Sequence, residues 1–290
     1  MQEITVFKAH TSYIIDLLFT QDSHTLVSCG MDNVVKLWSL PNWEHLGSFG
    51  GHTKSVNSLS LSPDGKILAT GSSDQTVKLW SFPDGEIRRT LQDRKKVVAS
   101  VRISADGKWI AAGSYGGRAA VWSLSGRELV AIKASRNNLT SVAFSPEGKT
   151  LATSGLGDEI KLWKLPTGQP IGTLNGHKTV VGSLTYIHNG SSLVSLGYEG
   201  TLIFWDTTNW QEKCRLNPGI PGIRSLAFSV DETTLAISME GMVQLWSVGD
   251  LSLQAELPVS TKVINGIAFS PDGRWIAIGA ADKKIRIWEL

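Results

Sequence analysis

Seven tryptophans recur along the chain at intervals of 41 or 42 residues, and this period constrains the fold more than any other feature. A repeat of this length is typical of one supersecondary unit that buries its apolar surface only by stacking on copies of itself. Seven regular repetitions therefore indicate one repeated architecture. The tryptophans are Trp38, Trp80, Trp122, Trp163, Trp205, Trp246 and Trp288.

Each tryptophan ends a short run with the alternating pattern of a β-strand. The residues one and three positions before it are apolar in all seven repeats, which is the period-2 signature of a strand. A second strand, such as 56–61, lies upstream and is followed by a turn such as Ser62-Pro-Asp-Gly65. Proline fixes φ at the turn entry and glycine supplies a positive φ. A third strand follows this turn, as at 67–70, and a fourth follows the tryptophan.

Four antiparallel strands in each of seven units predict an all-β chain with the seven-bladed β-propeller fold. A β-sandwich offers no reason for the regular period, and a solenoid would have atypical terminal repeats. We therefore expect one domain over residues 1–290. Its blades would end near residues 49, 91, 132, 174, 216 and 257, and 258–290 plus 1–9 would form the last blade.

That last blade requires pairing between the two ends of the chain. The run Ile4–Phe7 has the pattern of an outermost strand without inner strands of its own, and the last repeat stops two residues after Trp288. Pairing the two would close the ring and remove an open sheet edge, which is an aggregation hazard. We expect either a monomer or a domain of a longer chain, and the sequence leaves both open.

Composition narrows the function classes. A net charge of +2 argues against a surface built entirely for nucleic acid or acidic membranes. Two cysteines, Cys29 and Cys214, are too few for a disulfide scaffold and fit no metal spacing. The sequence shows neither a signal-peptide pattern nor an apolar run long enough to span a membrane. A cytoplasmic location is the resulting expectation.

The chain resembles the WD-repeat (β-transducin repeat) family over its whole length. The family's Gly-His pair is matched by Gly51-His52 and Gly176-His177, and by Ala9-His10 with one change, each histidine lying 28 residues before its tryptophan. Six residues before the tryptophan, Asp32, Asp74 and Asp282 match the family's turn acid, with glutamate at 199 and 240. The naming dipeptide occurs once, at Trp205-Asp206.

The resemblance implies hydrogen-bonded tetrads of His, Ser/Thr, an acid and Trp in three blades. A buried carboxylate and imidazole must find partners in any case, since leaving them unpaired costs several kcal/mol. A catalytic His/Ser/Asp set is the alternative, but its repetition on separate blades favours structure. The tetrads are His10, Ser28, Asp32 and Trp38; His52, Thr70, Asp74 and Trp80; and His177, Ser195, Glu199 and Trp205.

The other four blades lack this set, and we expect mainly apolar packing to hold them. The histidine position is occupied by Arg94, Ser135, Gly219 and Ser260, while Gly116 and Gly157 replace the turn acid. No phosphate-binding loop, nucleophile elbow or His/Cys metal spacing is present. We therefore expect no catalytic residue, metal or cofactor, and a protein that is not an enzyme.

Family resemblance also implies partner binding on the face around the channel mouth, where an apolar centre with a basic collar suits an acidic, partly apolar protein or peptide. Nucleic-acid binding is the second alternative, a propeller enzyme is the third, and related propellers serve as sensor domains. The expected face comprises Tyr13, Ile15, Met31, Asn57, Tyr115, Asn138, Leu156, Tyr198, Arg224, Met239 and Asn265. The basic collar comprises Lys54, Arg94, Lys95, Lys96, Arg136, Lys178 and Lys262.

Overall fold

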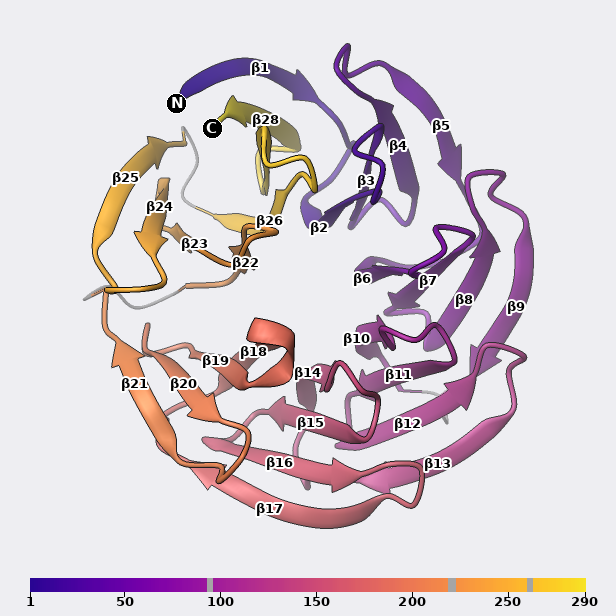
Figure 1. Cartoon of the computed structure of the whole chain (residues 1–290). Coiled ribbons are helices and arrows are strands. Elements are labelled where there is room, and N and C mark those ends of the chain that lie inside the picture. The colour runs from indigo at the N-terminus through magenta and orange to yellow at the C-terminus, as the bar shows by residue number, and fades with distance from the viewer. Residues whose placement is uncertain (93–95, 219–222, 260–262) are drawn as a thin grey trace. The chain divides into compact units, whose positions relative to one another are not determined.

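The computed structural model describes residues 1–92, 96–218, 223–259 and 263–290. Its strands form seven antiparallel sheets of four strands each, numbered here as blades along the chain (Figure 1). The prediction of an all-β, seven-bladed chain is confirmed. The residues divide into two compact units, unit 1 with 1–59 and 223–290 and unit 2 with 60–222. That the whole chain is one domain stays a prediction.

Unit 1 contains the first blade and the last two. The first blade is formed by β2 (Ile14–Phe19), β3 (Thr25–Gly30), β4 (Val35–Ser39) and β5 (His45–Phe49). The sixth is formed by β22 (Leu226–Phe228), β23 (Thr234–Met239), β24 (Met242–Ser247) and β25 (Leu253–Pro258). The seventh is formed by β26 (Ile264–Phe269), β27 (Trp275–Ala280), β28 (Lys284–Glu289) and β1 (Gln2–Lys8).

The remaining four blades follow one another along the chain. The second begins with β6 (Val56–Leu61), within which the two units divide, and continues with β7 (Ile67–Ser72), β8 (Thr76–Ser81) and β9 (Ile87–Gln92). The third has β10 (Val98–Ile103), β11 (Trp109–Ser114), β12 (Arg118–Ser123) and β13 (Glu128–Lys133). The fourth has β14 (Leu139–Phe144), β15 (Thr150–Gly155), β16 (Glu159–Lys164) and β17 (Gln169–Asn175). The fifth has β18 (Val181–Ile187), β19 (Ser192–Gly197), β20 (Leu202–Asp206) and β21 (Glu212–Leu216), with a short 3₁₀ turn, His188–Gly190, between its first two strands.

The seventh blade is completed by the first strand of the chain, as the sequence predicts. β1 lies antiparallel to β28, with Gln2 opposite Glu289 and Lys8 opposite Lys284 (Figure 1). The backbone N–H of Ala9 extends the contact by donating to the carbonyl of Lys283 at 2.9 Å. The outer edge of β28 is therefore paired and no longer open to another chain.

Within each unit, tryptophans of the repeat pack against the blade before their own. In unit 1 the buried Trp38 shares a cluster with Ile285 and Ile287 of β28. In unit 2 the buried Trp122 shares one with Leu79 and Leu91 of the second blade. The indole thus seals the joint between consecutive sheets, which explains why the period follows this residue type.

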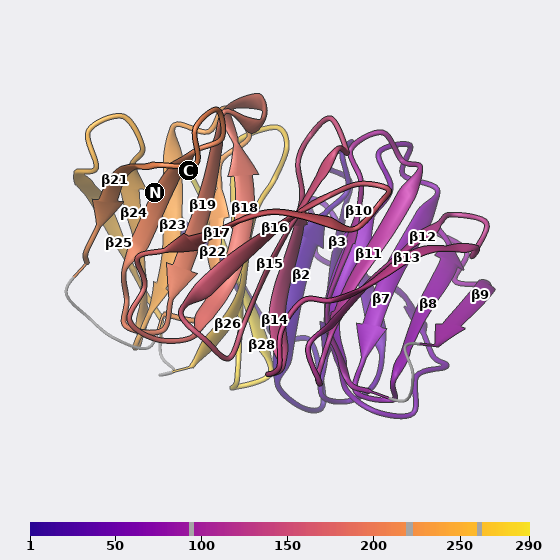
Figure 2. The ribbon, with the colours of Figure 1, turned by 90° about the horizontal axis from the view of Figure 1, so that it is seen from below.

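The innermost strands of unit 2 are also linked by hydrogen bonds from one blade to the next. The amide of Val142 in β14 donates to Ser100 Oγ of β10 at 3.4 Å, and that of Leu184 in β18 donates to Ser141 Oγ of β14 at 3.2 Å. Close approach requires small residues here, because a Cβ added to Gly113 of β11 would lie 2.8 Å from a methyl group of Val142. Figures 1 and 2 show these strands side by side.

In several blades the turn between the first and second strands has the same hydrogen-bonded arrangement. Ser62 Oγ donates to Asp64 Oδ1 at 2.5 Å, and the amide of Ile67 donates back to Ser62 Oγ at 2.9 Å. The same pattern recurs at Ser104–Asp106 and Ser270–Asp272. These hydrogen bonds stabilise the turns at the positions where the sequence has its Asp-Gly pairs.

The sixth blade departs from the common register by one residue. In the first blade Leu26, 12 residues before the tryptophan, lies opposite Trp38. In the sixth blade Leu235, 11 residues before, lies opposite Trp246. The hairpin between β23 and β24 is therefore one residue shorter than its counterparts.

Both cysteines are free thiols. Cys29 is buried, and burial raises its pKa well above the ordinary value. Among the described residues no helix is long and apolar enough to cross a membrane.

Candidate functional site

The first blade contains a continuous chain of four hydrogen-bonded side chains. Trp38 Nε1 donates to Ser28 Oγ at 2.9 Å, and Ser28 Oγ lies 2.8 Å from His10 Nε2. His10 Nδ1 donates to Asp32 at 2.9 Å. With Nδ1 carrying the proton, Nε2 of a neutral imidazole accepts from the serine hydroxyl, so each polar atom of the chain has a matching partner.

Burial controls the ionisation of this tetrad. It lowers the pKa of His10, and the hydrogen bond from His10 to Asp32 only partly opposes that effect. For Asp32, burial acts to raise the pKa, but hydrogen bonds from His10 and Thr11 outweigh it and hold the pKa below its ordinary value. A neutral histidine on an ionised aspartate is a structural arrangement that couples β3, β4 and the preceding loop.

The fifth blade has the same arrangement with glutamate in place of aspartate. His177 Nδ1 lies 2.7 Å from Glu199 Oε1, and its Nε2 lies 2.7 Å from Ser195 Oγ, which accepts from Trp205 Nε1 at 2.8 Å. Burial acts to raise the pKa of Glu199, but hydrogen bonds from Thr179 and His177 lower it. The longer side chain also reaches Thr179, so one carboxylate serves two loop residues.

In the second blade Trp80 Nε1 donates to Thr70 Oγ1 at 2.9 Å, and His52 is buried. The predicted sets thus come together in the first and fifth blades, and in the second the bond between Trp80 and Thr70 is present. In the first and fifth blades the histidine and the serine bond to each other directly, which leaves no room for a substrate between them.

Polar contacts also occur in three of the four blades that lack a complete tetrad. Thr153 Oγ1 accepts from Trp163 Nε1 at 2.9 Å in the fourth blade, and Gln244 Oε1 accepts from Trp246 Nε1 at 3.2 Å in the sixth. In the seventh the turn acid Asp282 pairs with the buried Arg286. Polar contacts therefore supplement the mainly apolar packing that the sequence predicts for these blades. A threonine ten residues before Trp163 was the available sequence signal, whereas Arg286 had none.

Five of the expected partner-binding side chains are large, apolar and exposed. Tyr13, Met31, Tyr115, Leu156 and Tyr198 each keep 43–48% of their surface accessible. All but Tyr13 directly follow the last residue of a strand, at the start of the hairpin that precedes the tryptophan strand. Arg224 is exposed as well, while Ile15, Asn57, Asn138 and Asn265 are half-buried.

Met239 was expected to be exposed, and this prediction is wrong. The side chain is only 4% accessible because Met239 is the last residue of β23 and lies opposite Met242. The one-residue shortening of its hairpin makes Met239 equivalent to Gly30 of the first blade, inside the sheet, and not to the exposed Met31. Counting back from the tryptophan assumes equal hairpins, and here they differ.

Two of the expected asparagines hold the chain itself together. Asn138 Oδ1 accepts from the amide of Gly116 at 2.9 Å. Asn265 Nδ2 donates to the carbonyl of Ile14 at 2.8 Å, linking the seventh blade to the first. Their amide groups are thus engaged within the fold, so the candidate site depends mainly on the tyrosines, Met31 and Leu156.

The basic collar is described only in part. Lys54, Lys96, Arg136 and Lys178 are exposed. Arg94, Lys95 and Lys262 lie outside the described residues, as do Gly219 and Ser260. Across the described ranges, no group of three or more His, Cys, Asp and Glu side chains could hold a metal ion.

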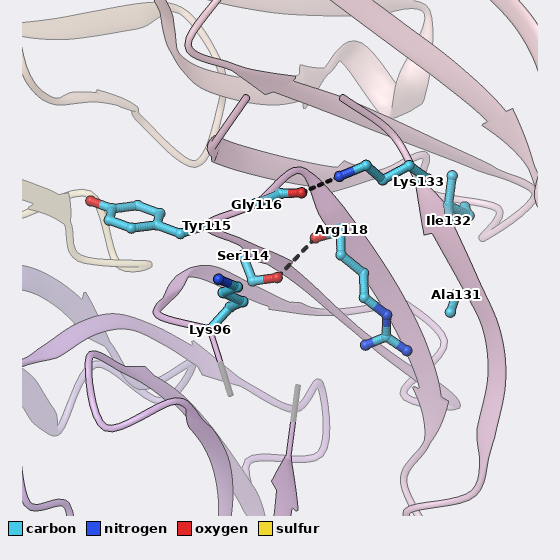
Figure 3. A pocket seen from close by; sticks show the side chains of 8 residues that line it. All are labelled: Lys96, Ser114, Tyr115, Gly116, Arg118, Ala131, Ile132 and Lys133. Atoms are coloured by element: carbon cyan, nitrogen blue, oxygen red, sulfur yellow. Dashed lines mark hydrogen bonds between the residues drawn. The ribbon is translucent and has the colours of Figure 1, made fainter. Parts of the chain in front are cut away.

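Two hollows in unit 2 coincide with missing tetrad side chains. In the fourth blade, one of about 170 Å³ is lined by Ser135 and Gly157, the residues that replace histidine and acid, and by Thr153. In the third blade, one of about 410 Å³ is lined by Lys96, Gly116, Arg118 and Lys133 (Figure 3). Sequence reasoning missed both, although small residues at several tetrad positions of one blade were a usable signal.

The family model described as "WD domain, G-beta repeat" matches residues 1–39, 43–81, 85–123, 126–164, 168–206 and 252–289. These six matches cover most of the chain. The longest stretch that the family model leaves unmatched, 207–251, contains the shortened hairpin of the sixth blade.

Similarity to curated proteins is moderate and partial. Periodic tryptophan protein 2 homolog of Neurospora crassa is 28% identical over 180 residues, which cover 53% of this chain and 20% of that protein. Protein FIZZY-RELATED 3 of Arabidopsis thaliana is 26% identical over 161 residues, covering 53% of this chain and 33% of that protein. Small ribosomal subunit protein RACK1y of Oryza sativa is 26% identical over 161 residues, covering 52% of this chain and 48% of that protein. The matched regions thus span between a fifth and about half of these relatives.

Proposed function

The chain belongs to the WD domain, G-beta repeat family, and from this we propose that it is a non-catalytic interaction domain for protein or peptide partners. The partners bind at the loops that carry Tyr13, Met31, Tyr115, Leu156 and Tyr198. The rice relative is named as a small ribosomal subunit protein, which supports a role in assembly with other macromolecules.

The observation that carries the proposal is the repeated exposure of large apolar side chains at equivalent loop positions. Tyrosine and methionine are enriched in protein interfaces. Tyrosine is also common in binding hot spots, because it buries much area at little cost in conformational entropy. In unit 2, Tyr115, Leu156 and Tyr198 occupy this position in three consecutive blades. The Tyr198 ring lies over Gly182, where a Cβ would clash with the ring, so the glycine leaves room for the tyrosine at this position.

The exposed basic side chains indicate that the partner is acidic. Lys54, Arg136 and Lys178 are exposed on loops near these apolar side chains in the sequence. An acidic peptide with apolar residues would satisfy both features, since complementary charge directs encounter while apolar contact supplies affinity. The roles of sensor domain and cytoplasmic protein remain part of this proposal.

The test compares two triple-alanine variants of the whole chain in affinity capture from the native lysate. Tyr13→Ala/Tyr115→Ala/Tyr198→Ala should lose specific partners that the wild type retains. Leu46→Ala/Ile87→Ala/Leu253→Ala removes exposed apolar side chains from the outermost strands β5, β9 and β25 and is the matched control. Equal capture by wild type and the tyrosine variant, at unchanged melting temperature, would refute the proposal.

A nucleic-acid partner is the second candidate, and the exposed Lys54, Arg136 and Lys178 favour it. Its signature is salt dependence, because several phosphate contacts would weaken binding on the order of 10³-fold between 50 and 200 mM salt. Measuring the binding of a labelled single-stranded RNA and a labelled duplex DNA across this range decides between the candidates. A shallow slope or no binding argues for the protein partner.

A further inference from the structure

The third blade has neither the hydroxyl residue nor the acid of the tetrad, and Arg94, at its histidine position, lies outside the described residues. Ala112 stands where other blades have serine or threonine, Gly116 replaces the turn acid, and Ala120 replaces the lysine found two residues before Trp38 and Trp80. Ala112 and Ala120 lie opposite each other in β11 and β12 and are fully buried. The sheet therefore has no polar side chain at these two positions.

The pocket of about 410 Å³ opens around the hairpin residues Ser114, Tyr115 and Gly116 of this blade (Figure 3). Its volume falls within the range of small-molecule and side-chain binding pockets. Gly116 has a φ of +87°, which favours glycine over other residues. A Cβ at this position would lie 3.6 Å from Lys96 Cε, so the lysine stem passes over the site where other blades carry a carboxylate.

The charged side chains among the described residues that line this pocket are all cationic. Lys96 precedes β10, Arg118 begins β12 and Lys133 ends β13. Arg118 is ion-paired with Glu128 at 2.9 Å, which offsets its charge. Lys133 Nζ donates to the carbonyl of Gly116 at 2.5 Å, a neutral partner that leaves its charge uncompensated (Figure 3). None of the described residues lining the pocket is acidic.

The walls beside these cations are apolar. Ala131 and Ile132 of β13 form one side. The Tyr115 ring, 43% accessible, extends away from them next to the pocket (Figure 3). A ligand that fits both parts has a carboxylate for the lysines and an adjacent apolar group for the tyrosine.

We propose that the third blade binds a glutamate or aspartate side chain of an acidic peptide between Lys96 and Lys133, with a neighbouring apolar residue of that peptide against Tyr115. This site rests on the proposed function, since it names the partner's chemistry for one of the interaction loops. It requires only this blade, whereas the general proposal depends on loops of several blades.

Fluorescence anisotropy of labelled peptides tests the site with the whole chain at 50 and 150 mM salt. The probe alternates glutamate and leucine, a second peptide has glutamine for glutamate, and a third has phosphoserine. We expect the glutamate peptide to bind at least ten times more tightly than the glutamine peptide. Lys96→Gln/Lys133→Gln should abolish that difference, while Lys66→Gln/Lys149→Gln, which removes two exposed lysines from hairpin turns, should retain it.

A second variant keeps the test decisive if the lysine variant fails to fold. Ala131→Glu places a carboxylate at the pocket wall and should compete with the peptide, lowering its affinity at least tenfold. Equal binding of the glutamate and glutamine peptides would overturn this site, and so would a preference for phosphoserine alone or unchanged binding by Ala131→Glu. The tyrosine-dependent capture described above would survive those results, so the two proposals fail separately.

Discussion

At the scale of single residues, the tryptophan of the repeat makes different hydrogen bonds in different blades. The tryptophan is invariant, but its indole N–H donates to serine or threonine in four blades and to glutamine in the sixth. In the seventh blade Trp288 Nε1 is buried without a hydrogen-bond partner. Trp38 and Trp122 both pack against the preceding sheet of their unit, and hydrogen bonding is added to packing only in some blades.

Trp122 allows the contribution of packing to stability to be measured without that of the tetrad, because the third blade lacks the tetrad. Its side chain is 3% accessible and lies in a cluster with Leu79 and Leu91. We expect Trp122→Ala to destabilise the protein by about 3–5 kcal/mol through lost contacts and the cavity left behind. Urea unfolding measures this, with Tyr115→Ala as an exposed control that should change stability little. A loss below about 1 kcal/mol would contradict the packing role.

Acidification should lower the stability of the folded protein in two steps. The pKa of His10 lies below its ordinary value of 6.5 in the folded chain, so as pH falls below 6.5 the unfolded chain takes up the proton first and stability decreases. The lowered pKa values of Asp32 and Glu199 stabilise the fold above their ordinary values of 3.8 and 4.5, and this contribution is lost as pH falls below them. Melting curves from pH 8 to 3 check this. His10→Gln should remove the first stage, and a wild type that gains stability between pH 7 and 5 would exclude the mechanism.

The fourth blade offers the converse experiment, the rebuilding of a tetrad. Thr153 and Trp163 are already hydrogen-bonded, and a Cβ at Gly157 would meet nothing within 4 Å. Ser135→His with Gly157→Asp should fill the hollow and add about 1 kcal/mol, or roughly 2–4 °C in melting temperature. Gly116→Asp in the third blade is the control and should destabilise, because its φ of +87° strains any other residue. No gain in the double variant would show that the hollow does not admit the pair.

At the scale of strands and hairpins, local chemistry determined what could be foreseen. Alternating apolar residues and Ser-Pro-Asp-Gly turns predicted the strands and the pairing of β1 with β28. The exposure of Met239 was predicted wrongly, since a one-residue shortening of a hairpin reverses which side chains enter the sheet. The interval from Trp205 to Trp246, 41 residues, carried a trace of that shortening, but the interval from Trp122 to Trp163 is the same and its hairpin is normal.

Deleting residues 2–8 tests the contribution of the terminal strand. β1 pairs with β28 along its length, and Phe7 lies 4.9 Å from Trp38 between ring centroids. Loss of several ladder hydrogen bonds and this contact should cost at least about 3 kcal/mol. Differential scanning calorimetry measures the effect, and Val6→Thr, an exposed change on the same strand, is the control. An unchanged melting curve in the deletion variant would disprove the role of β1.

At the scale of the whole molecule, periodicity was sufficient for the fold class and insufficient for the site. A period of 41 or 42 residues specifies how many sheets form, because each tryptophan must pack on a neighbouring copy. It does not specify which copies leave a pocket. That depends on the glycine at 116 in place of an acid and on Lys96 and Lys133, which the fold brings to the same pocket from distant parts of the sequence. Such coincidences arise only when the chain is folded.

The pairing of β1 with β28 has a consequence for how the chain is made. On a ribosome β1 emerges long before its partner, Lys284–Glu289, because the other blades lie between them in the sequence. At ~5–20 residues per second, β1 waits on the order of tens of seconds with its backbone unpaired. Ribosome stalling before β28 is made would prolong the time during which this strand is open to pairing with another chain.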